Sequence, residues 1–205
     1  MNILKVSTRT RRPFIKVCGQ TYTGSVDCST AFGAEYIGFN FCLGSSSYVS
    51  PAHAAGMRTA NVLRVGVFSQ HSTAEICHIM QAARLHLAQL HGELTQADAA
   101  VIGTERVIRV VRIQPGASAD SVQEELDAWA PFCRCYLVEC KEAAVLTKVN
   151  FPHPWILSGR MTAGELQNML SLCRPDGVDL DSSMAAFPGI GCAKHLLAAM
   201  NAVAV

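Results

Sequence analysis

The sequence predicts an α/β fold in which eight parallel strands close into a compact (β/α)8 barrel of the TIM type. Two observations carry this prediction: short apolar segments alternate with helix-like stretches, and there are eight of these segments. Alternating strands and helices are typical of parallel pairing, and eight such units close a barrel of this class. The expected strands lie within 14–19, 36–41, 64–68, 87–92, 107–111, 135–140, 154–159 and 177–181.

The stretches between these segments carry helix start signals. Ser50 before Pro51 predicts one start, and Ser72 with Glu75 three residues later predicts another. Thr162 opens the same capping pattern further along the chain. From the apolar spacing we expect helices near 24–34, 72–84, 118–130, 162–172 and 190–202.

One connection is short for this fold. About 15 residues, two of them proline, separate Glu139 from the strand near Trp155, and parallel strands need a connection of roughly a dozen residues or more. Residues 141–149 leave room for two helical turns. We therefore expect a shortened connection after the sixth strand.

The size and composition indicate one domain. The chain has 205 residues, of which 50% are hydrophobic and 16% charged, and barrels of this class usually need roughly 250 residues, with about 200 as the lower limit. We expect a single barrel domain at 14–205. Residues 1–13, which include several basic side chains, form an N-terminal extension that could be disordered.

Several functional classes are disfavoured. A net charge of +1 gives no electrostatic reason to expect a nucleic-acid partner. Nine cysteines without a Cys-x-x-Cys pair favour a reducing cytoplasm over a disulfide framework. No apolar run approaches the roughly 20 residues that span a membrane. No zinc spacing, phosphate loop or dinucleotide fingerprint occurs, so we expect a cytoplasmic protein without metal or cofactor.

Chemistry in such barrels lies where the strands end. Cys18 ends the first segment and Glu139 the sixth. A thiol there can serve as nucleophile or base when its thiolate is stabilised, or it can be a core cysteine. Glu139 is either a site residue or a rim charge. Asp179 can face the interior or the helices, and His91 can be structural or a ligand.

Small polar residues follow the last two strands. Ser158 and Gly159 follow the seventh, and Ser182 and Ser183 follow the eighth. Phosphate commonly binds there in such barrels, through backbone N–H groups and a helix N-terminus. These residues are therefore candidates for a phosphate site.

With these residues in view, the chain resembles phosphoribosylanthranilate isomerase, a small (β/α)8 enzyme of tryptophan biosynthesis, from about Ile15 to the C-terminus. The motifs occur in the order of that family and near its spacing. They are Lys-Val-Cys-Gly at 16–19, Gly-Phe-Asn-Phe at 38–41, Tyr-Val-Ser-Pro at 48–51, Arg-Val-Gly-Val-Phe at 64–68, Gln-Leu-His-Gly-Glu at 89–93, Leu-Ser-Gly at 157–159, Val-Asp at 178–179 and Ala-Phe-Pro-Gly at 186–189.

The resemblance implies an Amadori rearrangement of an aldosylamine to an aminoketose, without a cofactor. It implies that Cys18 is the general base and that Glu139, where the family has aspartate, is the general acid. The substrate-binding positions implied are Ser47, His91, Arg109, Ser158, Gly159, Arg160, Asp179, Ser182 and Ser183. The partner would be a phosphosugar-anthranilate, bound by a monomer or a homodimer.

Some positions depart from the family. Ser47 stands where the family has an arginine that holds the anthranilate carboxylate, and Arg160 replaces a glycine after the seventh strand. Asp181 would repel a phosphate, although Arg160 could supply positive charge by another route. Two alternatives stay open: a non-catalytic barrel that serves in ligand binding or interaction, and a phosphosugar isomerase with an altered substrate.

Overall fold

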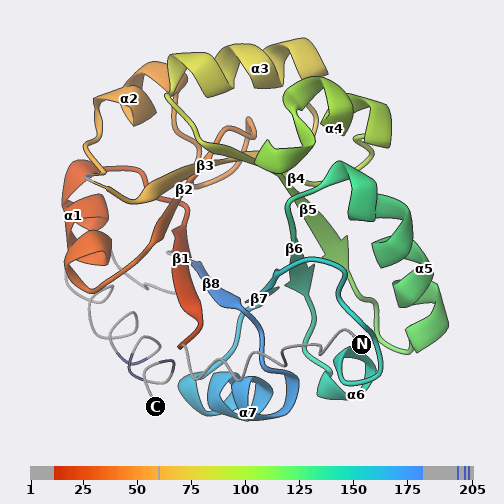
Figure 1. The fold of residues 1–205 in the computed structure, drawn as a ribbon. Coiled ribbons are helices and arrows are strands. Elements are labelled where there is room, and N and C mark those ends of the chain that lie inside the picture. Colours follow the sequence, from red (N-terminus) through yellow and green to blue (C-terminus); the bar gives the residue numbers. More distant parts are fainter. Residues whose placement is uncertain (1–11, 60, 182–197, 199–200, 202, 204–205) are drawn as a thin grey trace, which may run out of the picture.

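The computed structural model describes residues 12–59, 61–181, 198, 201 and 203, and its strands form a closed parallel ring (Figure 1). Each strand pairs with the next, and the last pairs with the first, which confirms the predicted barrel. The strands are β1 (Phe14–Cys18), β2 (Tyr36–Asn40), β3 (Leu63–Phe68), β4 (Leu87–Leu90), β5 (Val107–Arg112), β6 (Cys135–Glu139), β7 (Trp155–Ser158) and β8 (Gly177–Asp181).

The helices surround this ring on its outside (Figure 1). Ser50, Ser72 and Thr162 cap α2, α3 and α7 as predicted, and the last two form complete capping boxes. The elements are α1 (Thr23–Ala31), α2 (Pro51–Gly56), α3 (Thr73–Ala82), α4 (Gln96–Ile102), α5 (Ala119–Trp129), α6 (Ala143–Leu146) and α7 (Ala163–Cys173), with short 3-10 turns η1 (Thr104–Arg106) and η2 (Ala130–Phe132).

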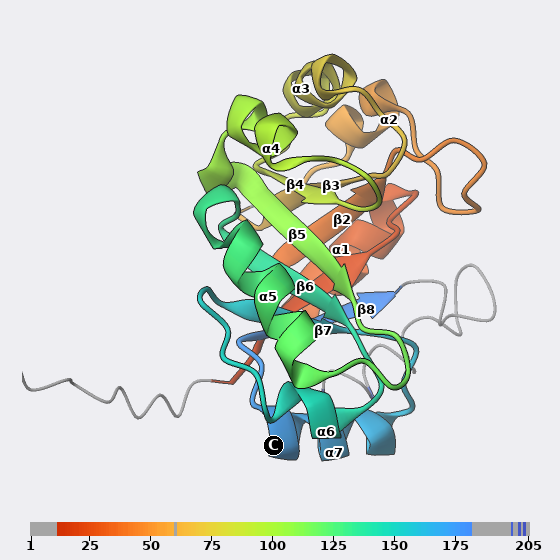
Figure 2. The same cartoon turned by 90° about the vertical axis from the view of Figure 1, so that its right-hand side faces the viewer.

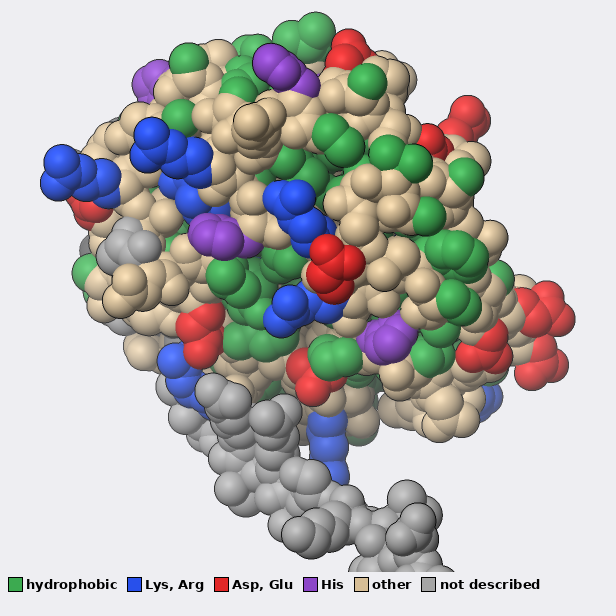
Figure 3. Space-filling model, turned by 45° about the horizontal axis from the view of Figure 1, so that its top comes forward, with side chains coloured by type: hydrophobic (Ala, Val, Ile, Leu, Met, Phe, Trp, Pro, Cys, Tyr) green, Lys and Arg blue, Asp and Glu red, His purple; other side chains and the backbone are tan. Residues whose placement is uncertain are grey.

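Some predicted segments fall outside the described residues. Residues 1–11 of the expected extension 1–13 are not among the described residues. Most of the helix expected at 190–202 is also outside them. The division into 1–13 and 14–205 therefore stays a prediction. No helix in the described ranges is long and apolar enough to cross a bilayer. On the face shown in Figure 3, basic and acidic side chains lie interspersed.

Alternate residues along each strand belong to two different cores. The larger core packs between the strands and the helices, and the smaller fills the barrel interior. In β5, Ile108 and Val110 belong to the interior, so Arg112 continues the inward set and Arg109 belongs to the outward one. The inner core contains Val65, Leu87, Ile108, Val110, Cys135, Leu137 and Ile156, with Phe14, Tyr36 and Leu63 packed against it.

The short connection after β6 does close the ring. It holds only the single turn of α6, less than the two turns expected, yet β6 and β7 pair from Tyr136↔Trp155 to Glu139↔Ser158. In Figure 1, α6 lies beside α7 at the edge of the ring. The shortened connection therefore leaves the carboxyl ends of β6 and β7 in register.

A buried arginine ties β3 to the helices outside it. Arg64 is 6% exposed and donates to the backbone oxygens of Ala54, Met57 and Ala83, which end α2 and α3. Its guanidinium also lies 4.7 Å from the centre of the Phe39 ring. One side chain thus satisfies carbonyls that a helix end leaves without an intrahelical partner.

Replacing Arg64 should destabilise the folded protein. We predict that Arg64→Met lowers the free energy of unfolding by about 2–4 kcal/mol, because several buried carbonyls lose their donor. Arg58→Met, at an exposed position nearby, should stay within about 0.5 kcal/mol of the unsubstituted protein. Urea unfolding of both variants is the measurement, and equal stabilities would contradict the role given to Arg64.

Candidate active site

The inward side chains at the carboxyl ends of the strands meet at one mouth of the barrel. The arrowheads of β5 and β8 point to the same side in Figure 2. Glu139 pairs in register with Arg112 of β5 and with Ser158 of β7, while Cys18 ends β1 beside β8. The parallel ring therefore places Cys18 and Glu139 at the same end of the barrel, on strands that lie three apart.

A buried ion pair lies next to Cys18. Lys16 is fully buried, and its Nζ lies 2.8 Å from Asp179 Oδ1 across the β1–β8 pairing. The other carboxylate oxygen accepts from Ser158 Oγ at 3.4 Å. Burial by itself lowers the pKa of Lys16, but Asp179 and then Cys18 raise it above its ordinary value. Lys16 is therefore an ammonium that also interacts with the Cys18 thiol, and a cation there stabilises a thiolate.

A glycine makes room for the thiol. A Cβ added at Gly38 would lie 2.8 Å from Cys18 Sγ and 3.0 Å from Cys18 Cα. Such contacts are closer than packed atoms tolerate. Gly38 on β2 therefore allows Cys18 its position at the mouth.

Glu139 is held by an arginine that the sequence pattern did not single out. Arg112 Nε lies 2.6 Å from Glu139 Oε2. The Arg112 side chain is 63% exposed and that of Glu139 31%. The 2.6 Å contact is a charge-assisted hydrogen bond in which the guanidinium donates and the carboxyl oxygen accepts.

His91 is neutral beside this carboxylate. Burial lowers the pKa of His91 to about 4 although Glu139 opposes the shift. The 3.9 Å separation of His91 Nδ1 and Glu139 Oε1 is therefore not an ion pair at neutral pH. Gln89 Nε2 lies 2.9 Å from His91 Nε2, and since the amide nitrogen donates, the ring proton is on Nδ1. That N–H lies on the side of Glu139.

Arg109 does not belong to the mouth, which corrects its prediction as a substrate-binding residue. It faces outward from β5 toward α5, which lies across β5 on the outside (Figure 2). Its guanidinium carbon lies 4.1 Å from the centre of the Trp129 ring and its Nη2 3.3 Å from Glu125 Oε1. The strand parity that turns Arg109 outward turns Arg112 inward.

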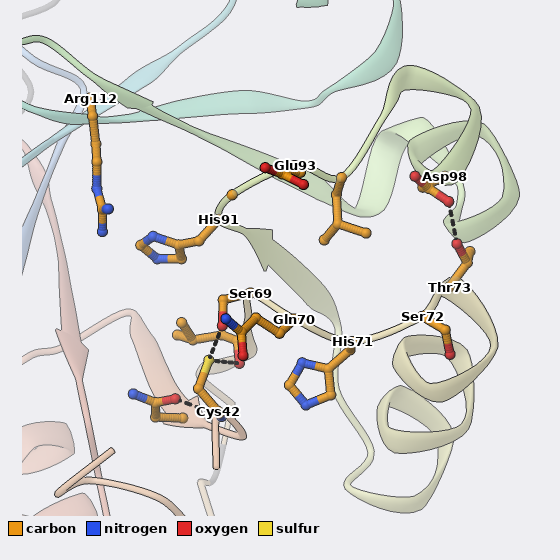
Figure 4. A pocket seen from close by; sticks show the side chains of 14 residues that line it. Cys42, Ser69, Gln70, His71, Ser72, Thr73, His91, Glu93, Asp98 and Arg112 are labelled. Atoms are coloured by element: carbon orange, nitrogen blue, oxygen red, sulfur yellow. Dashed lines mark hydrogen bonds between the residues drawn. The ribbon is translucent and has the colours of Figure 1, made fainter. Parts of the chain in front are cut away.

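The described residues line two hollows at the mouth. One, of about 920 Å³, lies over β2 to β5 and is lined by Cys42, Ser69, His71 and His91 among others (Figure 4). The other, of about 590 Å³, lies over β5 to β8 and is lined in part by Glu139, Lys141, Ser158, Gly159, Arg160 and Asp179. Among the described residues, Arg112 is the one that lines both.

Of the remaining predicted substrate-binding positions, one is described by the structure and two are not. Ser47 lies in the loop after β2, where Asn40 Nδ2 donates to it at 3.3 Å and to Ser45 at 3.0 Å. Ser182 and Ser183 lie outside the described residues. Within the described ranges, no group of three His, Cys, Asp or Glu side chains is arranged to hold a metal.

Because His91 is neutral in the folded protein, we predict that the free energy of unfolding depends on pH. Its pKa is about 4 in the folded protein and 6.5 is the ordinary value, so the unfolded chain takes up the proton first as the pH falls. The free energy of unfolding should therefore decrease between pH 6.5 and 4, with about 2 kcal/mol of this loss present by pH 5. Glu139, Arg112, Lys16 and Arg109 are the charged groups that act on His91.

Substituting His91 should remove this dependence. His91→Gln should flatten the stability change between pH 7 and pH 5 by about 2 kcal/mol, as measured by urea unfolding at both values. His78→Gln, at an exposed position of α3, is the matched control and should keep the slope. An unchanged slope in His91→Gln would contradict a buried neutral ring.

Sequence and structure comparisons agree on a family. The family model described as N-(5'phosphoribosyl)anthranilate (PRA) isomerase matches residues 15–190. A curated relative of that name from Desulfovibrio desulfuricans is 39% identical over 200 residues, covering 93% of this chain and 95% of the relative. Another from Maridesulfovibrio salexigens is 31% identical over 199 residues, covering 92% and 97%.

Solved structures show the same relationship. Phosphoribosylanthranilate isomerase from Thermotoga maritima, in a form described as monomers of a dimeric enzyme, superposes with a TM-score of 0.80 at 25% identity, covering 94% of this chain and 98% of that one. The Thermus thermophilus enzyme gives a TM-score of 0.79 at 28% identity, covering 93% and 98%. The chain therefore belongs to the N-(5'-phosphoribosyl)anthranilate isomerase family.

Proposed function

We propose that this chain converts N-(5-phosphoribosyl)anthranilate to 1-(2-carboxyphenylamino)-1-deoxyribulose 5-phosphate, as a cytoplasmic enzyme of tryptophan biosynthesis. The observation that carries the proposal is the placement of Cys18 and Glu139 at one mouth of the closed barrel. The names of the relatives support the substrate. An acid and a base on different strands are the two groups that an Amadori rearrangement requires.

Glu139 is the proposed general acid. Its carboxyl proton goes to the ribose ring oxygen as the C1–O bond breaks, and the nitrogen lone pair forms the C1=N bond of a protonated Schiff base. Glu139 becomes a carboxylate in this step. The Nδ1–H side of His91, 3.9 Å from Glu139, stabilises the charge that develops there.

Cys18 is the proposed general base. Its thiolate removes the proton from C2, the C–H electrons form the C1=C2 bond, and the C1=N electrons return to nitrogen. The resulting enolamine becomes the aminoketone when C1 gains a proton and the C2 hydroxyl loses one. Lys16, held beneath the thiol by Asp179, supports the thiolate that this step requires.

The two hollows suggest how the substrate lies. We assign the phosphate to the hollow over β5 to β8, where Lys141 and Arg160 supply positive charge beside Ser158 and Gly159. Ser182 and Ser183 remain part of this proposed phosphate site. The anthranilate ring then occupies the hollow over β2 to β5. Because every proposed group comes from one chain, a monomer and a homodimer fit equally.

If Cys18 and Glu139 are the base and the acid, substituting either should strongly reduce the turnover rate. Cys18→Ala and Glu139→Gln should each lower kcat by about 10²–10⁴-fold, the range expected for removal of a general base or acid. The assay follows the loss of fluorescence of freshly made N-(5-phosphoribosyl)anthranilate. Cys77→Ala, at an exposed cysteine of α3, is the matched control and should keep full activity.

The same assay separates the alternatives. A Cys18→Ala variant as active as the original would remove Cys18 from the mechanism. An unsubstituted protein that binds the product but does not turn over the substrate would favour the non-catalytic alternative. Turnover of a different phosphosugar amine alone would favour an altered substrate.

A further inference from the structure

Arg112 occupies a position that the reaction alone does not explain. It ends β5, lines both hollows and holds the carboxylate of Glu139 at 2.6 Å. A general acid must face the atom that it protonates, and the Glu139 oxygen that accepts from Arg112 is not free to face the ribose ring oxygen. Something must therefore draw Arg112 away from Glu139 before the acid can act.

The hollow over β2 to β5 offers few groups that could hold an anion. Among the described residues that line it, Arg112 is the one Lys or Arg, whereas Glu93 and Asp98 are acidic. Of its two histidines, His91 is neutral at neutral pH. The resemblance implies an arginine at position 47, but serine stands there. The cations of the other hollow, Lys141 and Arg160, lie over β6 and β7.

Arg112 has the chemistry to bind a carboxylate. The guanidinium has five N–H donors in a planar fork that matches a carboxylate. The contact with Glu139 uses Nε, and the side chain is 63% exposed. Figure 4 shows the Arg112 head directed toward His91 and the hollow. Donors are therefore available on the side where the aromatic ring would lie.

We infer that Arg112 clamps the aromatic carboxylate of the substrate, and that this carboxylate replaces Glu139 as its partner. This inference rests on the proposed function. The exchange transfers the exposed guanidinium from one carboxylate to another, so Arg112 keeps an ionic partner while Glu139 loses its own. Glu139 is then free to carry the proton that the ring oxygen receives, which makes arrival of the correct substrate the event that prepares the acid.

Other charged or titratable groups also lie near Glu139. His91 on β4 lies 3.9 Å away, and Asp179 on β8 is held by Lys16 of β1. Lys141, Glu142 and Arg160 line the second hollow with Glu139. Among these described groups, Arg112 is the cation that contacts Glu139 directly, and we therefore assign the change of partner to it.

The test uses two substrates that differ in one group. N-(5-phosphoribosyl)anthranilate carries the ring carboxylate, and the corresponding amine made from aniline lacks it. In Arg112→Gln, kcat/KM for the anthranilate substrate should fall about 10- to 100-fold through a higher KM, the loss expected for a charge-assisted contact. For the aniline substrate, which has no carboxylate to draw Arg112 away, kcat/KM should not fall, because the substitution removes no contact with that substrate and releases Glu139.

A matched control and a binding measurement complete the test. Arg134→Gln, an exposed arginine just before β6 at the opposite end of the barrel, should leave both substrates unaffected. Binding of the carbonyl-reduced product, with and without its ring carboxylate, is measured by calorimetry. Arg112→Gln should weaken only the compound that has the carboxylate, and urea unfolding checks that the variant is folded.

The outcomes are distinguishable. Equal losses for both substrates, or equal binding of both reduced products, would overturn the role of Arg112 and leave the proposed function intact. An unsubstituted protein without turnover would overturn the proposed function. In that case the two reduced products still decide whether Arg112 recognises the carboxylate.

Discussion

The buried ion pair between Lys16 and Asp179 is the interaction on which the site depends. It joins β1 to β8, residues 163 positions apart in the chain, at a separation of 2.8 Å. Removing two charges from water is costly, and an apolar pair of similar volume would often hold two strands as well. We therefore ascribe the role of the buried Lys16 charge to its effect on the neighbouring thiol of Cys18.

From this pair a continuous set of polar groups crosses the mouth. Asp179 accepts from Ser158, Ser158 pairs in register with Glu139, and Glu139 contacts Arg112. Each proposed reacting group thus has a cation beside it, Lys16 for Cys18 and Arg112 for Glu139. The difference is burial: the fully buried Lys16 keeps its partners, whereas the exposed Arg112 can exchange its partner for a substrate group.

The sequence predicted the strands and most helix starts because those signals are local. It missed α4, whose capping box uses Thr95 and Asp98 instead of the usual glutamate. Arg109 was expected at the site from the resemblance, and Arg112 was not singled out, because inward and outward positions cannot be distinguished until the partner strands are known. The Lys16–Asp179 pair depends on ring closure, which no local pattern specifies.

The alkylation rate of Cys18 by iodoacetamide at pH 7, followed by mass spectrometry of its peptide, tests this account most directly. The double variant Lys16→Met with Asp179→Asn removes the cation without leaving a buried carboxylate unpaired. If Lys16 stabilises the thiolate, the Cys18 rate should fall several-fold because the thiolate is the species that is alkylated, while exposed Cys77 keeps its rate. An unchanged Cys18 rate in the folded double variant would contradict the account.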